Sequence, residues 1–125
     1  MDEQEPPPAG TSGAGAGERY AVQLGRTVDR LRSLAIARLS APFEPEPTRA
    51  DAAHRLAQRL ADVAAGLDGG GSRSLPRLAD PAVGDQVAVC GHDLLDAAAA
   101  HGDREQAEAV LVAAAADLLD LRRRL

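Results

Sequence analysis

Apolar residues recur every three or four positions along most of this chain, the spacing that places side chains on one face of an α-helix. Between residues 18 and 40 the recurring positions are Tyr20, Leu24, Val28, Leu31, Ala35 and Leu39. Similar stripes occupy residues 48–67, 81–101 and 103–124. The pattern therefore predicts four amphipathic helices with about these bounds.

Residues with known capping roles mark where the predicted helices begin and end. Thr48 and Asp103 stand where a side chain can accept a hydrogen bond from the first helical turn, and Asp80 followed by Pro81 is a further start signal. Gly102 is expected to end the third helix. Because only a few residues join the third helix to the fourth, these two helices should form an antiparallel hairpin.

Four amphipathic helices with short connections favour an all-α fold, an up-down-up-down four-helix bundle. A three-helix bundle with the first helix loosely attached is the alternative. Residues 1–17 are rich in Pro, Gly, Ala and acidic side chains and offer nothing to bury, so we expect this tail to be disordered. One helical domain, residues 18–125, should follow it.

Composition argues against several classes of function. The chain has 125 residues with one Tyr, one Phe and no Trp, so few rings are available to stack on bases or sugars. All 14 basic residues are Arg, a bias typical of GC-rich actinobacterial genomes. The net charge is −5 and the arginines form no broad patch, so we expect no nucleic-acid partner. No phosphate-binding loop or catalytic triad is recognisable, and we expect no enzyme, cofactor or small-molecule ligand.

The sequence also predicts a compartment. A single cysteine, Cys90, cannot form an internal disulfide and suits a reducing environment. No apolar run reaches the roughly 20 residues that a membrane span needs. The acidic, proline-rich start is unlike a signal peptide. We therefore expect a cytoplasmic protein without membrane contact.

The residues best suited to chemistry are concentrated in residues 80–101, which hold Cys90, His92, His101 and four aspartates but no cation. Cys90 falls on the apolar stripe and should be buried. His92 falls on the opposite side of the helix, too far away to act as a base for the thiol. His92 and Asp96 share a face, yet two ligands without a third do not make a metal site. We expect neither a catalytic nor a metal-binding residue.

His92-Asp93-Leu94 resembles the His-x-Leu opening of the motif of histidine phosphotransfer proteins, which are four-helix bundles of about this size. The resemblance implies that His92 would accept a phosphoryl group. It stops there, because the family has a basic residue and then Gly after the Leu, where this chain has Leu95 and Asp96. The nearby aspartates would also repel a phosphohistidine. A phosphotransfer or metal-handling module that uses His92 is the alternative function.

The favoured interpretation is a non-catalytic module that acts through protein–protein contacts, with another protein or with a second copy of itself. The helix at residues 18–40 carries five Arg and is basic, whereas residues 80–101 are acidic. A few apolar residues also fall outside the core stripes. The possible interaction face comprises Asp85, Val89, His92, Asp93, Asp96, Val22, Arg26, Arg30 and Ile36.

Overall fold

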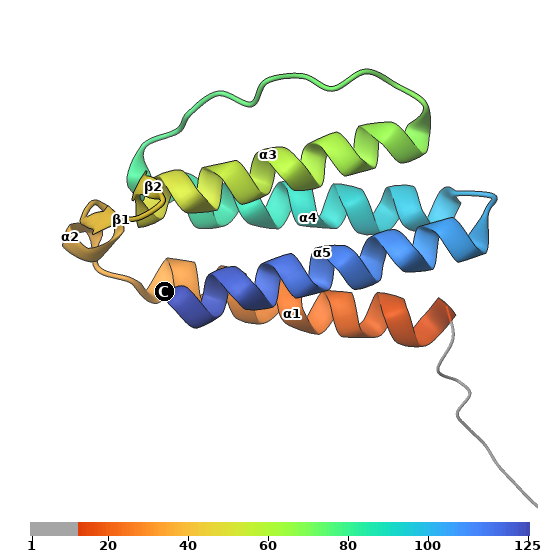
Figure 1. The fold of residues 1–125 in the computed structure, drawn as a ribbon, viewed down its shortest axis with the longest axis horizontal. Helices are drawn as coiled ribbons and strands as arrows, with labels where there is room; N and C mark the ends of the chain where they lie inside the picture. Colours follow the sequence, from red (N-terminus) through yellow and green to blue (C-terminus); the bar gives the residue numbers. More distant parts are fainter. Residues whose placement is uncertain (1–12) are drawn as a thin grey trace, which may run out of the picture.

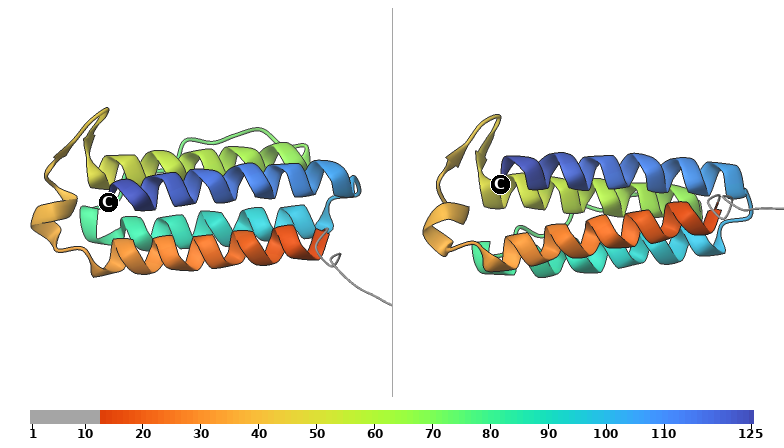
Figure 2. Two further views of the ribbon diagram at one scale, coloured as in Figure 1. Left: turned by 60° about the horizontal axis from the view of Figure 1, so that its bottom comes forward. Right: turned by 90° about the horizontal axis from the view of Figure 1, so that it is seen from below.

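A computed structural model describes residues 13–125 of the chain. Four long helices run side by side (Figures 1 and 2). They are α1 (Gly13–Ser33), α3 (Arg49–Asp68), α4 (Val83–Ala100) and α5 (Arg104–Arg124). The shorter elements are α2 (Ile36–Leu39), a 3₁₀ turn η2 (Asp80–Ala82), and two antiparallel strands, β1 (Pro42–Phe43) and β2 (Glu46–Thr48). The all-α class is confirmed, with one small strand pair added at an end of the molecule.

The first helix begins earlier than predicted. α1 starts at Gly13, so the expectation of disorder is wrong for residues 13–17, while residues 1–12 lie outside the described residues. Small side chains are useful here because they fit close to neighbouring helices. Ala16 is only 4% exposed, and a Cβ on Gly17 would lie 3.9 Å from Cδ1 of Leu95 on α4.

The predicted helix at residues 18–40 is also interrupted, at Ala35, whose backbone is extended (φ −64°, ψ 148°). α1 ends two residues earlier, and α2 begins at Ile36. Leu31 and Leu39, on either side of the break, are both buried. The apolar spacing continues across the break, so it could not reveal where the helix stops.

The helix directions differ from the predicted up-down-up-down order. α3 and α4 run in the same direction, α1 and α5 run together in the opposite direction, and α4 and α5 form the expected antiparallel hairpin (Figure 1). Contacts between α3 and α4 agree with this direction. Nδ1 of His54, early in α3, lies 2.9 Å from Oε1 of Gln86, early in α4. At the other end, Nδ1 of His101, which follows α4, lies 3.1 Å from the carbonyl oxygen of Leu67. The up-down-up-down order is therefore wrong.

The reversal depends on residues 69–79, which we call the strap. The strap leaves the end of α3, runs back along that helix without regular structure, and delivers the chain to the start of α4 (Figure 1). An extended residue advances about 3.3 Å and a helical residue about 1.5 Å, so a segment of this length can return along all 20 residues of α3. By composition residues 69–72 are a flexible linker, and residues 73–79 are expected to lie against the bundle without regular structure, which is confirmed. Neither feature indicates that the chain returns along α3, which explains the wrong topology.

Two of the predicted helix starts are confirmed. Oγ1 of Thr48 accepts a hydrogen bond from the backbone N–H of Asp51 at 3.0 Å, and Oδ1 of Asp103 accepts one from Gln106 at 3.1 Å. Each bond satisfies an N–H that has no partner inside its own helix.

The third predicted cap is wrong. Asp80 makes no capping bond to the start of α4, because its carboxylate accepts hydrogen bonds from Oγ of Ser40 and Nη2 of Arg77 instead. Asp80 and Pro81 form a 3₁₀ turn, and α4 begins only at Val83.

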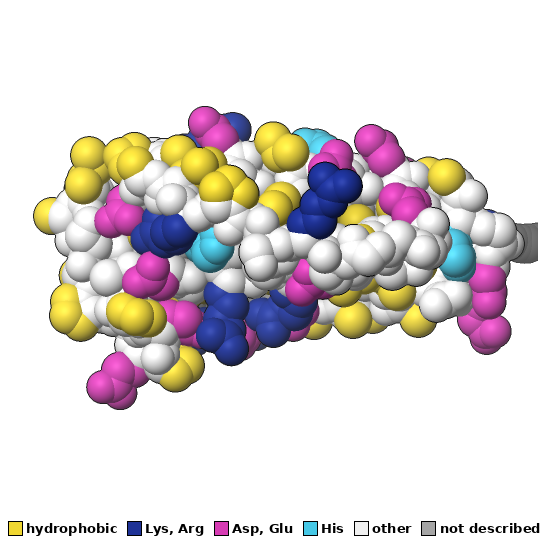
Figure 3. Space-filling model, turned by 90° about the horizontal axis from the view of Figure 1, so that it is seen from above, with side chains coloured by type: hydrophobic (Ala, Val, Ile, Leu, Met, Phe, Trp, Pro, Cys, Tyr) yellow, Lys and Arg dark blue, Asp and Glu magenta, His cyan; other side chains and the backbone are white. Residues whose placement is uncertain are grey.

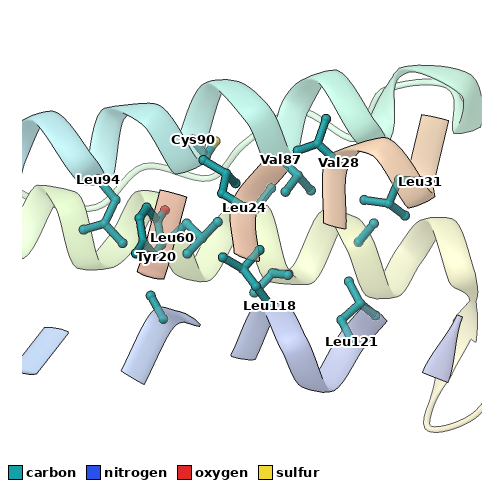
Figure 4. Packing of buried hydrophobic residues seen from close by; sticks show 14 of the residues in the cluster. Tyr20, Leu24, Val28, Leu31, Leu60, Val87, Cys90, Leu94, Leu118 and Leu121 are labelled. Carbon is teal, nitrogen blue, oxygen red and sulfur yellow. The ribbon is translucent and has the colours of Figure 1, made fainter. Parts of the chain in front are cut away.

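The core lies between the four long helices. Leu24, Leu60, Leu94 and Leu118, one from each helix, are each at most 2% exposed (Figure 4). α1 and α4 approach each other closely at Gly91, where an added Cβ would overlap the side chain of Leu24. A side chain at position 91 would therefore require Leu24 to move, and glycine avoids this. Beside it, the buried hydroxyl of Tyr20 donates to the carbonyl oxygen of Gly91 at 2.8 Å.

Candidate interaction surfaces

The residues predicted as one interaction face are all exposed, but they belong to different parts of the structure. Asp85, Val89, His92, Asp93 and Asp96 are on α4. Val22, Arg26 and Arg30 are on α1, and Ile36 is on the short helix α2. The structure therefore divides the predicted face into an α4 part, an α1 part and an isolated residue.

On α4, Asp85, Val89, His92 and Asp96 follow one another at spacings of four, three and four, so they share one side of the helix. We call these residues, with the adjacent Asp93, the α4 outer face. Val89 is 61% exposed, more than any other large apolar side chain of residues 13–125. Asp85 accepts a hydrogen bond from Arg32 at 2.6 Å. Asp93 and Asp96 have no ion pair within the described chain.

Cys90 and His92 are separated as the sequence predicts. Cys90 is 5% exposed, and burial, followed by the negative charge of Asp93, raises the pKa of its thiol. The raised pKa keeps the sulfur protonated and unreactive. His92 is exposed and lies on the α4 outer face. Across residues 13–125, no three His, Cys, Asp or Glu side chains lie together in a way that could hold a metal ion.

The α1 residues of the predicted face lie beside α5. A groove of about 170 Å³ runs between the two parallel helices, and its lining residues are Ala16, Arg19, Gln23, Val112, Ala115, Ala116 and Leu119. A second hollow of about 230 Å³ adjoins the groove and is lined by Glu18, Arg19, Val22 and Gln23. We call the residues that line these two hollows the α1–α5 face.

The α1–α5 face exposes aliphatic side chains from both of its helices. Val22 is 47% exposed and Val112 is 55% exposed. Ala116, one turn beyond Val112, is exposed as well, and Leu119 is half-buried. The face is therefore apolar at its centre, although the core beneath it is complete without these residues.

Gln23 gives the same groove a polar feature. Its Oε1 atom is buried and has no hydrogen-bond partner among the described residues. A buried acceptor without a partner costs about 1–3 kcal/mol. Because this oxygen is buried, a donor on another molecule reaches it only when the Gln23 side chain turns toward the groove that it lines.

Arginines surround the far end of the α1–α5 face. Nη1 of Arg122 donates to Oγ1 of Thr27 at 3.1 Å and to the carbonyl oxygen of Gln23 at 3.4 Å. Partial burial, together with the charges of Arg26 and Arg123, lowers the pKa of Arg122. Three cations therefore lie close enough to repel one another, which makes this end of the face attractive to an anionic group.

The opposite side of the molecule is built differently, because the strap covers part of it and leaves hollows of about 600 and 690 Å³ beside α3. The side-chain amide of Gln58 on α3 donates to the carbonyl oxygen of Arg73 at 2.8 Å and accepts from the backbone N–H of Leu75 at 2.7 Å. One side chain thus pairs with the extended strap as a neighbouring strand would. Charged side chains of both signs lie around the strap on this side (Figure 3).

A second amide holds the strap from α4. Nε2 of Gln86 donates to the carbonyl oxygen of Pro76 at 3.0 Å, and its Oε1 lies 2.9 Å from Nδ1 of His54. Because the amide oxygen can only accept, Nδ1 of His54 carries the proton of this bond. His54 is thereby a structural residue that orients Gln86.

Arg77 anchors the end of the strap through two carboxylates. Its Nε lies 3.0 Å from Asp51 and its Nη2 lies 2.8 Å from Asp80. Partial burial acts to raise the pKa of Asp51, but hydrogen bonds from Arg77 and Thr48 outweigh it, and the pKa is lowered. Hydrogen bonds from Ser40 and Arg77 likewise lower the pKa of Asp80.

Sequence reasoning missed the α5 half of the α1–α5 face and every contact of the strap. One signal for α5 was present: Val112 and Ala116 are apolar residues four apart on the side away from the Leu111, Leu118 stripe. The strap had no such signal, because Gln58 and Gln86 look like ordinary surface glutamines until the fold brings residues 73–76 beside them.

No family model, no curated protein and no solved structure matches this chain. Within residues 13–125, no helix combines the length and the apolar character needed to cross a membrane.

Proposed function

We propose that this protein is a small helical-bundle docking module, which binds another protein through the α1–α5 face and has no chemistry of its own. Its four long helices form a bundle of two parallel pairs. The observation that carries the proposal is the pair of exposed valines, Val22 and Val112, beside a groove between α1 and α5.

The lining of the groove indicates the kind of partner. An apolar centre favours aliphatic side chains on the partner, since burial of apolar surface stabilises a complex by about 25 cal/mol per Å². The orphaned Oε1 of Gln23 favours a hydrogen-bond donor at the groove. Arg26, Arg122 and Arg123 favour carboxylates nearby. An amphipathic, acidic helix meets all three requirements.

The remaining polar clusters of the described chain support a structural role rather than catalysis. His54, Gln58, Gln86 and Arg77 all make hydrogen bonds that secure the strap. Cys90 is buried with a raised thiol pKa. Each of these groups thus has an internal partner or is kept from solvent, which leaves them little freedom to act on a substrate.

Affinity capture with three forms of the full chain tests the proposal. Ala116→Arg places a long cation in the groove at an exposed position, and Ser74→Arg adds the same side chain to the exposed strap as a matched control. We expect the wild-type chain and the Ser74→Arg form to retain the same partner from an extract of the native host, and the Ala116→Arg form to lose it. Loss with Ser74→Arg and retention with Ala116→Arg would contradict the proposal.

A further inference from the structure

We infer that the α1–α5 face binds the α4 outer face of a second copy of this chain. The inference rests on the proposed docking role of the α1–α5 face and names its partner. The two faces have complementary properties, and they lie on different helices of the molecule. Each copy can therefore offer one face while it receives the other.

The α4 outer face has the properties that the groove requires. It is a continuous helical surface with a single aliphatic residue, Val89, at 61% exposure. Asp93, one turn further along, and Asp96, two turns further along, have no ion pair within residues 13–125. α4 itself carries no Lys or Arg. An exposed valine beside carboxylates that form no ion pair is the pattern of an acidic amphipathic helix, although Arg73 of the strap lines the same hollow as Asp93 and Asp96.

Arginines on and beside the α1–α5 face supply the opposite charge and outnumber the one carboxylate that lines it, Glu18. Arg26, Arg122 and Arg123 lie close together at its far end, and Arg19 lines the groove beside the valines. None of these four arginines has a carboxylate partner within 4.0 Å among the described residues. Contact between the two faces would bring Val89 against Val22 and Val112 and give both groups of charges partners.

The contact would be head-to-tail, because the two faces are different surfaces. Such contacts do not close after two copies: they produce a ring or an open chain. Each added copy still exposes one free α4 outer face and one free α1–α5 face. Association should therefore grow with protein concentration, and it should weaken with added salt because charges contribute to it.

Two variants, each with one blocked face, make this arrangement testable. Val89→Arg blocks the α4 outer face with a cation, and Ala116→Arg fills the groove of the α1–α5 face. Both positions are exposed, so neither change should affect folding, which far-UV circular dichroism and thermal unfolding can verify. Ser74→Arg on the strap is the control that adds the same charge elsewhere.

Sedimentation velocity of the full chain at rising concentration is the readout. We expect the wild-type chain and the Ser74→Arg form to form species larger than a monomer, and each blocked variant alone to remain monomeric. A mixture of the two blocked variants should give a one-to-one dimer and nothing larger, since one intact face of each kind remains.

The opposite results are equally specific. If the mixture stays monomeric while the wild-type chain associates, copies meet through other surfaces and the inference is wrong. If the wild-type chain is monomeric at all concentrations, self-pairing is rejected. The docking role then still stands on its own test, because the loss of a different partner with Ala116→Arg does not depend on self-association.

Discussion

The two parallel helix pairs of this molecule differ in whether another segment of the chain lies over the groove between their helices. Between α3 and α4, the chain covers its own surface with the strap, which is held by the amides of Gln58 and Gln86 and by Arg77. Between α1 and α5, no described segment lies over the groove, and Val22 and Val112 remain exposed beside it.

The comparison separates two ways of completing a helix pair. A groove covered from within needs polar anchors, because a strap without regular structure leaves backbone groups that must find hydrogen bonds. A groove left open needs none, but it leaves apolar area in water, and such area is commonly a site of interaction. The strap thus contributes to the fold of the α3–α4 side, although hollows of about 600 and 690 Å³ remain there; at the α1–α5 side the apolar groove itself is left without a covering segment.

The largest effect is expected where the two pairs meet, at Gly91. Gly91→Val should lower the free energy of unfolding by about 3 kcal/mol, because the added atoms overlap the buried Leu24 side chain. Gly25→Ala is the matched control, since nothing lies within 4 Å of its added Cβ. It should raise stability by about 0.5–1 kcal/mol through helix propensity. Urea unfolding measures both, and equal effects would show that α1 and α4 do not pack at Gly91.

Within the open pair, Thr27 joins α1 to α5. Its hydroxyl, fully buried, donates to the carbonyl oxygen of Leu118 at 3.2 Å. Thr27→Val preserves the shape and removes that bond together with the one that the hydroxyl accepts from Arg122, so the free energy of unfolding should fall by at least about 1 kcal/mol. Ser33→Ala, which removes an exposed bond to Arg30 within α1, should change it by less than about 0.5 kcal/mol. If the two changes lowered the free energy of unfolding equally in urea, the buried hydroxyl of Thr27 would make no special contribution to stability.

In the covered pair, loss of an anchor should act locally. Gln58→Ala removes both bonds to the strap, and the amide of Leu75 should exchange with solvent several-fold faster, while core amides change little. Gln58→Glu keeps the acceptor for Leu75 and should give an intermediate rate. Hydrogen exchange followed by NMR distinguishes these cases, and an unchanged Leu75 rate in both variants would mean that the strap does not depend on Gln58.

The Arg77 anchor should also depend on pH. The folded pKa values of Asp51 and Asp80 are lowered, so the stability they contribute is present above the unfolded value of about 3.8 and disappears as the pH falls through the lowered values. Carboxyl carbon NMR titration should find both pKa values below 3.8, and Arg77→Ala should move both upward. Titration of either group at or above 3.8 in the wild-type chain would contradict the pairing of Arg77 with Asp51 and Asp80.

The smallest effect is expected at His92, which is exposed on the α4 outer face and lies outside the α1–α5 groove. His92→Ala should change thermal stability by less than about 0.5 kcal/mol and leave capture through the α1–α5 face of the same molecule intact. Acid-labile phosphate on the purified wild-type chain that is absent from the His92→Ala form would favour the phosphotransfer alternative.

Periodic features of the sequence predict the core well and the connections poorly. Leu24, Val87 and Leu118 each repeat within a stripe of their own helix, so their burial follows from local spacing. Gly91 is a local irregularity within such a stripe, and its close packing could be inferred for that reason. Contacts between residues far apart in the sequence, such as Gln58 with Leu75, depend on the path of the chain, and the apolar periodicity of single helices does not indicate that path.

The candidate surfaces show the same limit. Exposure of Val22, Val89 and Ile36 could be predicted, because each residue lies off its helix's stripe. Their grouping could not, since it depends on which helices are neighbours. An up-down-up-down order does not make α1 and α5 a parallel pair, and only that pairing places Val112 near Val22.

Hydrogen exchange of the complex with the captured partner tests the docking claim most directly. Peptides that cover residues 16–24 of α1 and 109–120 of α5 should gain protection when the partner binds, while the strap, residues 69–79, should exchange as it does in the free chain. Protection confined to the strap and α3, with α1 and α5 unchanged, would contradict the account.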